Sequence, residues 1–292
     1  HEMNVFQIHL SIFIFPYRSS QQQVFNDEET LHLPENYYIG WMETLDDNKF
    51  ISDITIPGTH DSLALHGGPA AECQAWSLKD QLNAGIRYFD LRVSGDDLKV
   101  VHGPISQHTT FFEAFNTIKD FLSIFRTETV LVRLKHSSKF PDHVISELEH
   151  ESNSWLRNDI PRIRDVRGKV VFVQKKSFHL GVSLYETDKH GDYKVGRVVK
   201  KKDKIITHLN EALEACRSGS VVLNYSSGTG FPLLRVDNSP KSLAKEINPW
   251  LYDNLKGASE EKIKLCFGII AMDFPGFDLI QAVINFNKQV GI

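Results

Sequence analysis

The chain has 292 residues, of which 41% are hydrophobic and 24% are charged, close to the averages of soluble globular proteins. This composition excludes disorder, a collagen-like fibre and a bundle of membrane helices as the main description of the chain. The net charge of −4 disfavours a protein that binds nucleic acid mainly by electrostatics, although it leaves room for a local cationic pocket.

Residues 1–38 differ from the rest and are expected to form an N-terminal tail or leader. The stretch 18–27 (RSSQQQVFND) is polar and unpatterned, as is typical of a tail. The apolar run 5–17 is too short to span a membrane but could belong to a secretory signal. The alternative, a non-native or poorly defined leader, is favoured slightly, because a basic start and a small-residue cleavage site are missing. Localisation therefore stays open between cytoplasmic and secreted, with peripheral contact with membranes.

From residue 39 onward, short apolar segments alternate with amphipathic ones. Segments rich in β-branched or apolar residues predict strands over 51–56, 86–92, 98–102, 129–134, 169–174, 193–199, 220–225 and 264–272. Apolar residues at helical spacing predict helices over 74–83, 110–125, 142–156, 203–216, 239–255 and 276–288.

Strands that alternate with helices indicate right-handed βαβ units and a largely parallel sheet. About eight such strands fit an α/β fold of the irregular (β/α)8 TIM-like barrel type, formed as a single domain by residues 39–292. An open doubly wound sheet is the alternative. It is less favoured because the sequence contains no glycine-rich phosphate loop of the dinucleotide or P-loop type.

Polar residues stand at the ends of most predicted strands. In a parallel barrel the carboxyl ends of the strands form one rim, which carries the active site. The residues that would meet there are His60, Asp61, Asp90, Arg92, His102, Lys135, Lys175 and Asp273. A rim with only a structural role would not require polar residues at the same end of so many strands.

These residue types suit acid–base chemistry at a phosphodiester. Two histidines can act as base and acid in one turnover, because the imidazole pKa lies near neutrality. A carboxylate can orient each ring, and Arg92 offers a planar fork for phosphate oxygens. The sequence therefore predicts in-line transfer to an internal hydroxyl, with Arg92 supplying the positive charge that a metal would otherwise provide.

Three motifs, 56–62 (IPGTHDS), 85–92 (GIRYFDLR) and 101–104 (VHGP), resemble the catalytic X region of phosphatidylinositol-specific phospholipase C. The similarity is to the small bacterial-type enzymes and the X-domain-only animal relatives, and it extends over roughly residues 40–290. The resemblance implies an irregular barrel that cleaves phosphatidylinositol to diacylglycerol and a 1,2-cyclic inositol phosphate.

The resemblance also implies a role for each acid–base residue. His60 would be the general base that takes the proton of the inositol 2-hydroxyl, with Asp273 as its orienting partner. His102 would be the general acid that protonates the diacylglycerol oxygen, with Asp61 as its partner.

The remaining predicted site residues would bind the substrate or help to order the site. Arg92 would hold the phosphate oxygens, Asp90 would help to order the site, and Lys135 and Lys175 would bind the inositol ring. Lys175 stands where bacterial members have an arginine, and the region 178–202 is too dissimilar to place further ring ligands, Asp192 and Tyr193 being only guesses.

No cofactor and no metal are expected. Calcium-dependent relatives have Asn after the first histidine and a Glu-x-Asp pair where this chain has Asp90-x-Arg92. The expected partners are phosphatidylinositol or its glycosylated forms, with transient contact with a membrane surface and no nucleic acid. The alternatives are a non-catalytic inositide-binding module and a metal-dependent glycerophosphodiesterase, which would need clustered carboxylates.

Two further features are expected to be structural. Cys73, Cys216 and Cys266 are too few for a disulfide scaffold and are expected to be buried apolar residues. The run Lys200–Lys202 is expected to be a solvated loop, since a membrane-attracting role would rest on only three charges.

Overall fold

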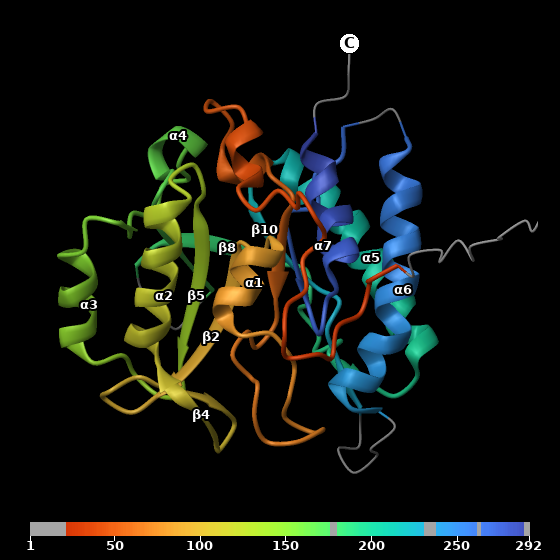
Figure 1. Cartoon of the computed structure of the whole chain (residues 1–292), viewed down its shortest axis with the longest axis horizontal. Helices are drawn as coiled ribbons and strands as arrows, with labels where there is room; N and C mark the ends of the chain where they lie inside the picture. The colour runs from red at the N-terminus through yellow and green to blue at the C-terminus, as the bar shows by residue number, and fades with distance from the viewer. Residues whose placement is uncertain (1–21, 176–179, 231–237, 262–263, 289–292) are drawn as a thin grey trace, which may run out of the picture.

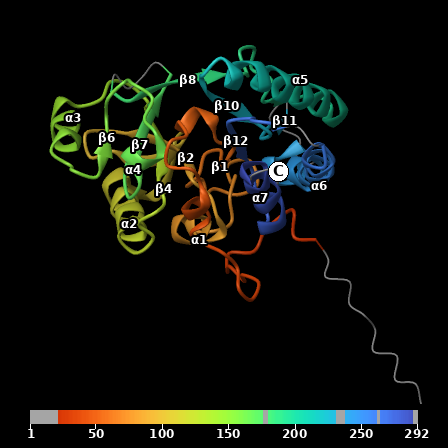
Figure 2. The same ribbon diagram turned by 90° about the horizontal axis from the view of Figure 1, so that it is seen from above.

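Seven parallel strands close into a barrel in the computed structural model, which describes residues 22–175, 180–230, 238–261 and 264–288 (Figure 1). The strands follow the order β1, β12, β10, β8, β7, β5 and β2, and β2 pairs again with β1. Helices surround the barrel when it is seen from above (Figure 2). The predicted irregular TIM-like barrel is thereby confirmed, and the open sheet is excluded.

The elements have the following bounds. The barrel strands are β1 (Ile56–Thr59), β2 (Tyr88–Ser94), β5 (Val130–His136), β7 (Val170–Gln174), β8 (Val182–Glu186), β10 (Val221–Tyr225) and β12 (Ile269–Met272). The other strands are β3 (Lys99–His102), β4 (Ile105–Thr110), β6 (Ser154–Trp155), β9 (Lys194–Val195) and β11 (Thr229–Gly230). The α-helices are α1 (Leu78–Ala84), α2 (Phe111–Ile124), α3 (Asp142–Glu149), α4 (Ile163–Val166), α5 (Val198–Arg217), α6 (Pro240–Ser259) and α7 (Phe277–Ile284).

Two predicted strands are wrong. Residues 51–53 form a 3-10 turn, in which the Asp53 carboxylate accepts the Phe50 N–H, so β1 begins only at Ile56. The predicted strand 193–199 is reduced to β9, because helix α5 begins at Val198. Its place in the barrel is taken by β8, whose outer side is partly exposed and which therefore lacks a continuous apolar run.

The third predicted strand exists but lies outside the barrel. β3 pairs antiparallel with β2 and with β4, forming a hairpin at the lower end of the molecule in Figure 1. His102, the last residue of β3, reaches the rim because this hairpin folds back along β2. The rim position was right, but the parallel pairing inferred for the strand was wrong.

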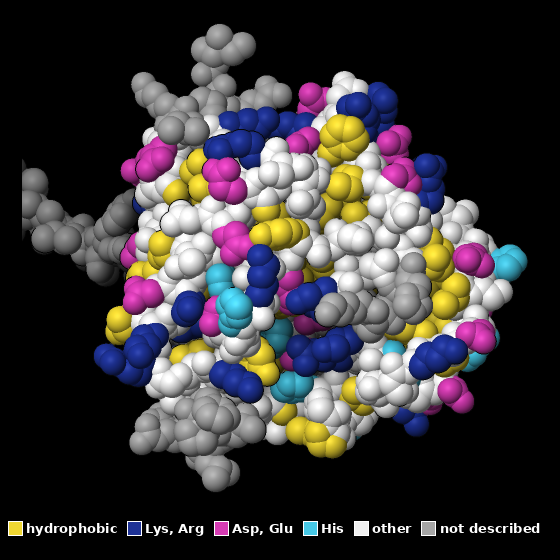
Figure 3. All heavy atoms as spheres, turned by 180° about the vertical axis from the view of Figure 1, so that it is seen from behind, with side chains coloured by type: hydrophobic (Ala, Val, Ile, Leu, Met, Phe, Trp, Pro, Cys, Tyr) yellow, Lys and Arg dark blue, Asp and Glu magenta, His cyan; other side chains and the backbone are white. Residues whose placement is uncertain are grey.

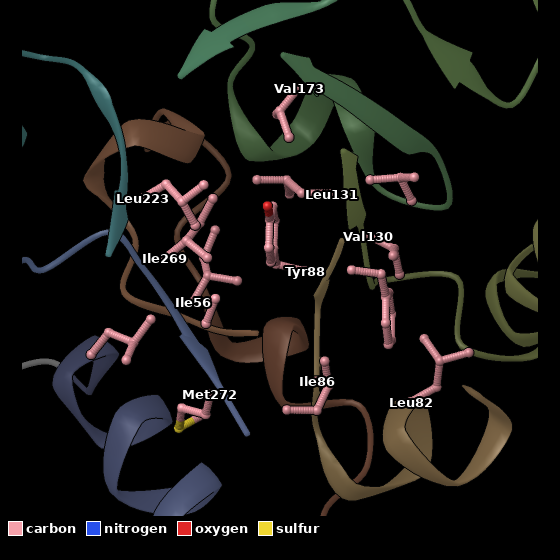
Figure 4. Close-up of a cluster of buried hydrophobic side chains, with 14 of the residues drawn as sticks. Ile56, Leu82, Ile86, Tyr88, Val130, Leu131, Val173, Leu223, Ile269 and Met272 are labelled. Carbon is pink, nitrogen blue, oxygen red and sulfur yellow. The ribbon is translucent and has the colours of Figure 1, made fainter. Parts of the chain in front are cut away.

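The barrel interior is filled by side chains from six strands. Figure 4 shows Ile56, Leu131, Val173, Leu223 and Ile269 meeting around the ring of Tyr88. Gly58 in β1 makes this packing possible, since a Cβ atom there would lie 2.7 Å from the Tyr88 ring. A tightly packed interior holds the rim residues in fixed positions.

At the amino-terminal end of β2, Arg87 and Glu128 form a fully buried ion pair. The Arg87 Nε donates to Glu128 at 2.9 Å, and its other nitrogens donate to the carbonyls of Leu82, Ile86 and Ile39. The pair joins α1, β2 and the segment before β5, and it lies at the opposite end of the barrel from the rim.

The cysteines only partly follow the expectation. Cys73 is buried with a free thiol, whereas Cys216 and Cys266 form a disulfide that ties the end of α5 to the segment before β12. Sequence spacing could not reveal this pair, because 50 residues separate the two cysteines and only the fold brings them together.

The segment that precedes the barrel packs against its outside. Val24 is buried, and Phe25 forms an isolated antiparallel bridge with Pro275. Residues 1–21, which include the apolar run of the expected leader, lie outside the described residues. Among the helices that the structure describes, none combines the length and apolar character that a membrane span requires.

Candidate active site

One cavity of about 380 Å³ opens at the carboxyl ends of the barrel strands. It is lined by six of the eight predicted site residues, namely His60, Asp61, Arg92, His102, Lys135 and Lys175. Asp90 and Asp273 are buried beside them. Figure 3 shows a face of the molecule on which histidine, basic and acidic side chains gather around a recess. The volume is within the range of small-molecule sites.

His60 and Asp273 are brought together by paired strands. β1 and β12 are in register at Thr59 and Met272, so the next residue of each strand emerges side by side. The His60 Nδ1 lies 3.0 Å from an Asp273 carboxylate oxygen. Burial lowers the pKa of His60, but the carboxylates of Asp61 and Asp273 raise it by more, to about 9. Asp273 therefore orients the ring and favours its protonated form.

Asp61 connects the two histidines. Its Oδ2 lies 3.3 Å from the Nε2 of His60 and 3.3 Å from the Nε2 of His102. Its backbone has φ of 40°, a conformation that non-glycine residues rarely adopt. Asp90 helps to hold it, because its carboxylate accepts the Asp61 N–H at 3.3 Å. Both imidazoles therefore face the same small region of the cavity.

Arg92 completes this group. Its Nε lies 2.5 Å from the Asp61 Oδ1, and its Nη2 lies 3.5 Å from the His60 Nε2 and 4.0 Å from Asp90. Burial lowers the pKa of Arg92, but the carboxylates of Asp61 and Asp90 raise it by more, so the net shift of the pKa is upward. The side chain is 37% exposed, which leaves donors available toward the cavity.

Lys135 and Lys175, which the sequence predicts to bind the inositol ring, line the same cavity. Lys135 lies opposite Arg92 in the register of β2 and β5. Burial, together with Arg92 and Arg133, lowers the pKa of Lys135. Lys175 follows β7 and forms an ion pair with Glu186 at 2.5 Å. Lys135 and Lys175 therefore lie beside Arg92, on the cavity wall formed by β5, β7 and β8.

Three site residues were missed by the sequence analysis. Arg133, Glu186 and Tyr225 all line the cavity, and Arg133 donates to the Tyr225 hydroxyl at 2.6 Å and lies 3.6 Å from Glu186. The alternation of β5 could have revealed Arg133, which is two residues from Lys135 and points to the same side. Glu186 could not be found because its strand was missed.

The two residues guessed in the region 178–202 differ in outcome. Tyr193 lines the cavity, as do Asp188 and Gly191 of the same loop. Asp192 does not. Its carboxylate lies 2.9 Å from the Nε2 of the buried His208, so it attaches the loop to helix α5. Residues 178 and 179 of this region lie outside the described residues.

Several site residues have the chemistry of metal ligands. In the described part of the chain, the three groups with ligand atoms within 4.8 Å of one another all belong to this site, and one consists of His60, Asp61 and Asp90. The guanidinium of Arg92 contacts the same Asp61 carboxylate. A cation at this place would compete with a fixed positive charge of the protein.

The chain is similar to known phosphatidylinositol-specific phospholipases C. The family model described as "Phosphatidylinositol-specific phospholipase C, X domain" matches residues 48–176. The 1-phosphatidylinositol phosphodiesterase of Listeria monocytogenes is 28% identical, over 85% of this chain and 84% of its own length. The enzyme of that name from Staphylococcus aureus strain Newman is 23% identical, over 87% of this chain and 95% of its own length.

Solved structures give the same result. The structure of the Listeria monocytogenes phosphatidylinositol-specific phospholipase C has a TM-score of 0.75 and 28% identity, covering 87% of this chain and all of its own. A Staphylococcus aureus phosphatidylinositol-specific phospholipase C has a TM-score of 0.71 at 22% identity, covering 86% of this chain and 98% of its own, which bears on the fold alone. Residues 48–176 thus match the X domain of phosphatidylinositol-specific phospholipase C, and the barrel as a whole is similar to the Listeria monocytogenes enzyme.

Proposed function

We propose that the chain is a phosphodiesterase that cleaves phosphatidylinositol to diacylglycerol and 1,2-cyclic inositol phosphate without calcium. The observation that carries this proposal is the contact of His60, His102 and Arg92 with the single carboxylate of Asp61 at the wall of one cavity. An acid, a base and a phosphate-binding cation are thereby available within one small volume.

The first step forms one bond and breaks another. His60 removes the proton of the inositol 2-hydroxyl, whose oxygen attacks phosphorus and closes the five-membered cyclic phosphate. His102 gives a proton to the diacylglycerol oxygen, which leaves as an alcohol. Asp273 holds His60 with its Nε2 toward the cavity, because the Nδ1 is engaged at 3.0 Å.

Arg92 supplies the positive charge at the phosphate. It is held between Asp61 and Asp90, and its spare donors face the position where negative charge develops. A fixed guanidinium next to both carboxylates leaves no need for a divalent cation in this step. Calcium independence therefore belongs to the proposal.

The inositol ring would lie against Lys135 and Lys175. Lys135 is 43 residues beyond Arg92 in sequence but its direct neighbour across β2 and β5, so one substrate can contact both. Tyr225 lines the cavity, and its ring lies nearly perpendicular to that of His60 at 5.9 Å between centroids. The lipid part remains in the bilayer, so the enzyme contacts a membrane surface transiently, and glycosylated phosphatidylinositol is an alternative substrate.

Turnover in the presence of EDTA tests the proposal directly. Phosphatidylinositol in vesicles should give diacylglycerol and cyclic inositol phosphate at the same rate with and without the chelator. Loss of activity with EDTA would overturn the role of Arg92. Binding of phosphatidylinositol vesicles with no product under either condition would overturn the enzymatic proposal and favour an inositide-binding module.

A further inference from the structure

Helix α5 begins with an unusual concentration of positive charge. Residues 193–204 (YKVGRVVKKKDK) contain six cations and one acid, a net charge of +5 in a chain whose net charge is −4. Six residues of this segment form what is called here the α5 basic surface: Tyr193, Lys194, Arg197, Val199 and Lys200, which are exposed, and Lys202, which is partly exposed. Lys201 is excluded because its side chain is buried.

These cations lie where they destabilise the helix. The amino-terminal end of an α-helix carries a partial positive charge, so it favours acidic side chains and disfavours lysine and arginine. The first turn of α5 contains no acidic residue, and its N-cap position is occupied by Arg197, whose side chain makes no capping hydrogen bond. The charge pattern is therefore not explained by the stability of α5.

The acids that the structure describes nearby leave two cations of this surface, Arg197 and Lys200, uncompensated. In the described part of the chain, Arg197 and Lys200 have no carboxylate within ion-pair distance, and Lys202 lies over the Trp250 ring at 5.8 Å. Asp192 is only 14% exposed and is already paired with His208, while Lys204 lies 3.9 Å from it. Asp203 is the one acid of the segment that faces solvent.

The α5 basic surface begins at the mouth of the active site. Helices that follow barrel strands start at the carboxyl-end rim, and α5 follows β8. Tyr193 lines the cavity and is 46% exposed. Lys194 of β9 pairs with Thr229 of β11, which also lines the cavity. Figure 2 shows α5 at the outer edge of the molecule, beside β11 and α6.

We propose that the α5 basic surface binds anionic lipid membranes and thereby sets the cavity against the bilayer. This inference rests on the proposed function, since a substrate anchored in a bilayer requires a membrane across the cavity mouth. Clustered lysine and arginine side chains are attracted to anionic lipid headgroups. An exposed tyrosine and the 62% exposed Val199 add groups suited to the interface between headgroups and acyl chains.

The test uses vesicles that contain no substrate. The triple variant Lys194→Gln, Arg197→Gln and Lys200→Gln is compared with wild type by co-sedimentation with phosphatidylcholine vesicles, with and without phosphatidylserine. The wild type should bind phosphatidylserine-containing vesicles more tightly, and binding should weaken as salt is added. The variant should lose affinity on the order of 100-fold, following the typical contribution of each cation near an anionic surface.

A matched control removes the same charge from the other end of the barrel. Arg126 lies just beyond α2, Arg217 and Lys256 lie in the last turns of α5 and α6, and all three are exposed. Their replacement by Gln should leave vesicle binding close to wild type. Equal losses in the two triple variants, or equal wild-type binding to neutral and anionic vesicles, would overturn the proposal.

Activity measurements separate this proposal from the proposed function. The α5 variant should cleave phosphatidylinositol in anionic vesicles more slowly but should keep its activity on a water-soluble inositol phosphodiester. Anionic vesicle binding without any turnover would overturn the enzymatic proposal and leave the membrane surface supported. Unchanged turnover of vesicle substrate in the α5 variant would overturn the membrane role.

Discussion

The two arginines of the β2 region show how one residue type serves two ends of the same barrel. Arg87 is fully buried, and its guanidinium donates to Glu128 and to three backbone carbonyls. Arg92 is 37% exposed and lies between the carboxylates of Asp61 and Asp90, with part of its guanidinium left free toward the cavity. A guanidinium with its donors engaged fastens the fold, whereas one with donors left over can bind a substrate phosphate. The difference separates a structural end of the barrel from a chemical one.

The largest effects on activity are expected at the histidines of the chemical end. Replacing His60 or His102 by Ala removes the proposed base or acid and should lower turnover of phosphatidylinositol by about 10²–10⁴-fold. Thermal unfolding of the His102 variant should change little, because this side chain lies at the cavity wall. Retention of most of the activity in either variant would refute the assignment of that residue.

A matched pair of variants tests the comparison itself. Arg87→Met leaves the Glu128 carboxylate buried without its partner and should cost about 3–5 kcal/mol in the free energy of unfolding. Arg92→Met should lower activity by about 10²–10³-fold and cost less stability in urea unfolding than Arg87→Met, because its guanidinium is partly exposed. If Arg87→Met does not fold, the double variant with Glu128→Leu should restore folding. A large stability loss in Arg92→Met would contradict the division between the two ends.

The pH dependence of the site sharpens the comparison with a smaller effect. Because the pKa of His60 is raised to about 9, the pH profile of kcat/KM should show an inflection near pH 9 that reports the titration of this base. Asp273→Asn removes one carboxylate that raises this pKa and should move the inflection to lower pH. An inflection that stays in place would show that Asp273 does not control His60.

The stability of the folded chain should also depend on pH through His60. The folded protein binds the His60 proton more tightly than the unfolded chain, whose histidine pKa is 6.5. The resulting stabilisation is complete below about pH 6.5 and is lost as pH rises through about 9. Urea unfolding across this range should therefore show stability that falls as pH rises, and the slope should be smaller in Asp273→Asn.

Much of the site could be predicted because its residues stand next to strand ends in the sequence. His60, Arg92, Lys135 and Asp273 needed only the rule that parallel strands share one rim, and the structure brings all four together. The fold class followed from the same alternation of strands and helices. The fold class and these strand-end site residues could therefore be predicted from local sequence patterns, without the structure.

The remainder depends on contacts that no local pattern carries. Glu186 lies on a strand with a partly exposed side, which lacks the apolar run of its neighbours. His102 reaches the rim through an antiparallel hairpin rather than a barrel strand. The disulfide between Cys216 and Cys266 depends on the approach of two segments far apart in the chain. Predicting these features requires knowledge of tertiary pairing.

The barrel closes through two narrow seams, and both border the site. β1 and β2 pair at only two positions, as do β7 and β8, whereas β2 and β5 pair at six. His60 and Arg92 stand on either side of the first seam, and Lys175 and Glu186 on either side of the second. Local opening of either strand pair separates residues that must act together. On heating, activity should therefore be lost at a lower temperature than that of global unfolding.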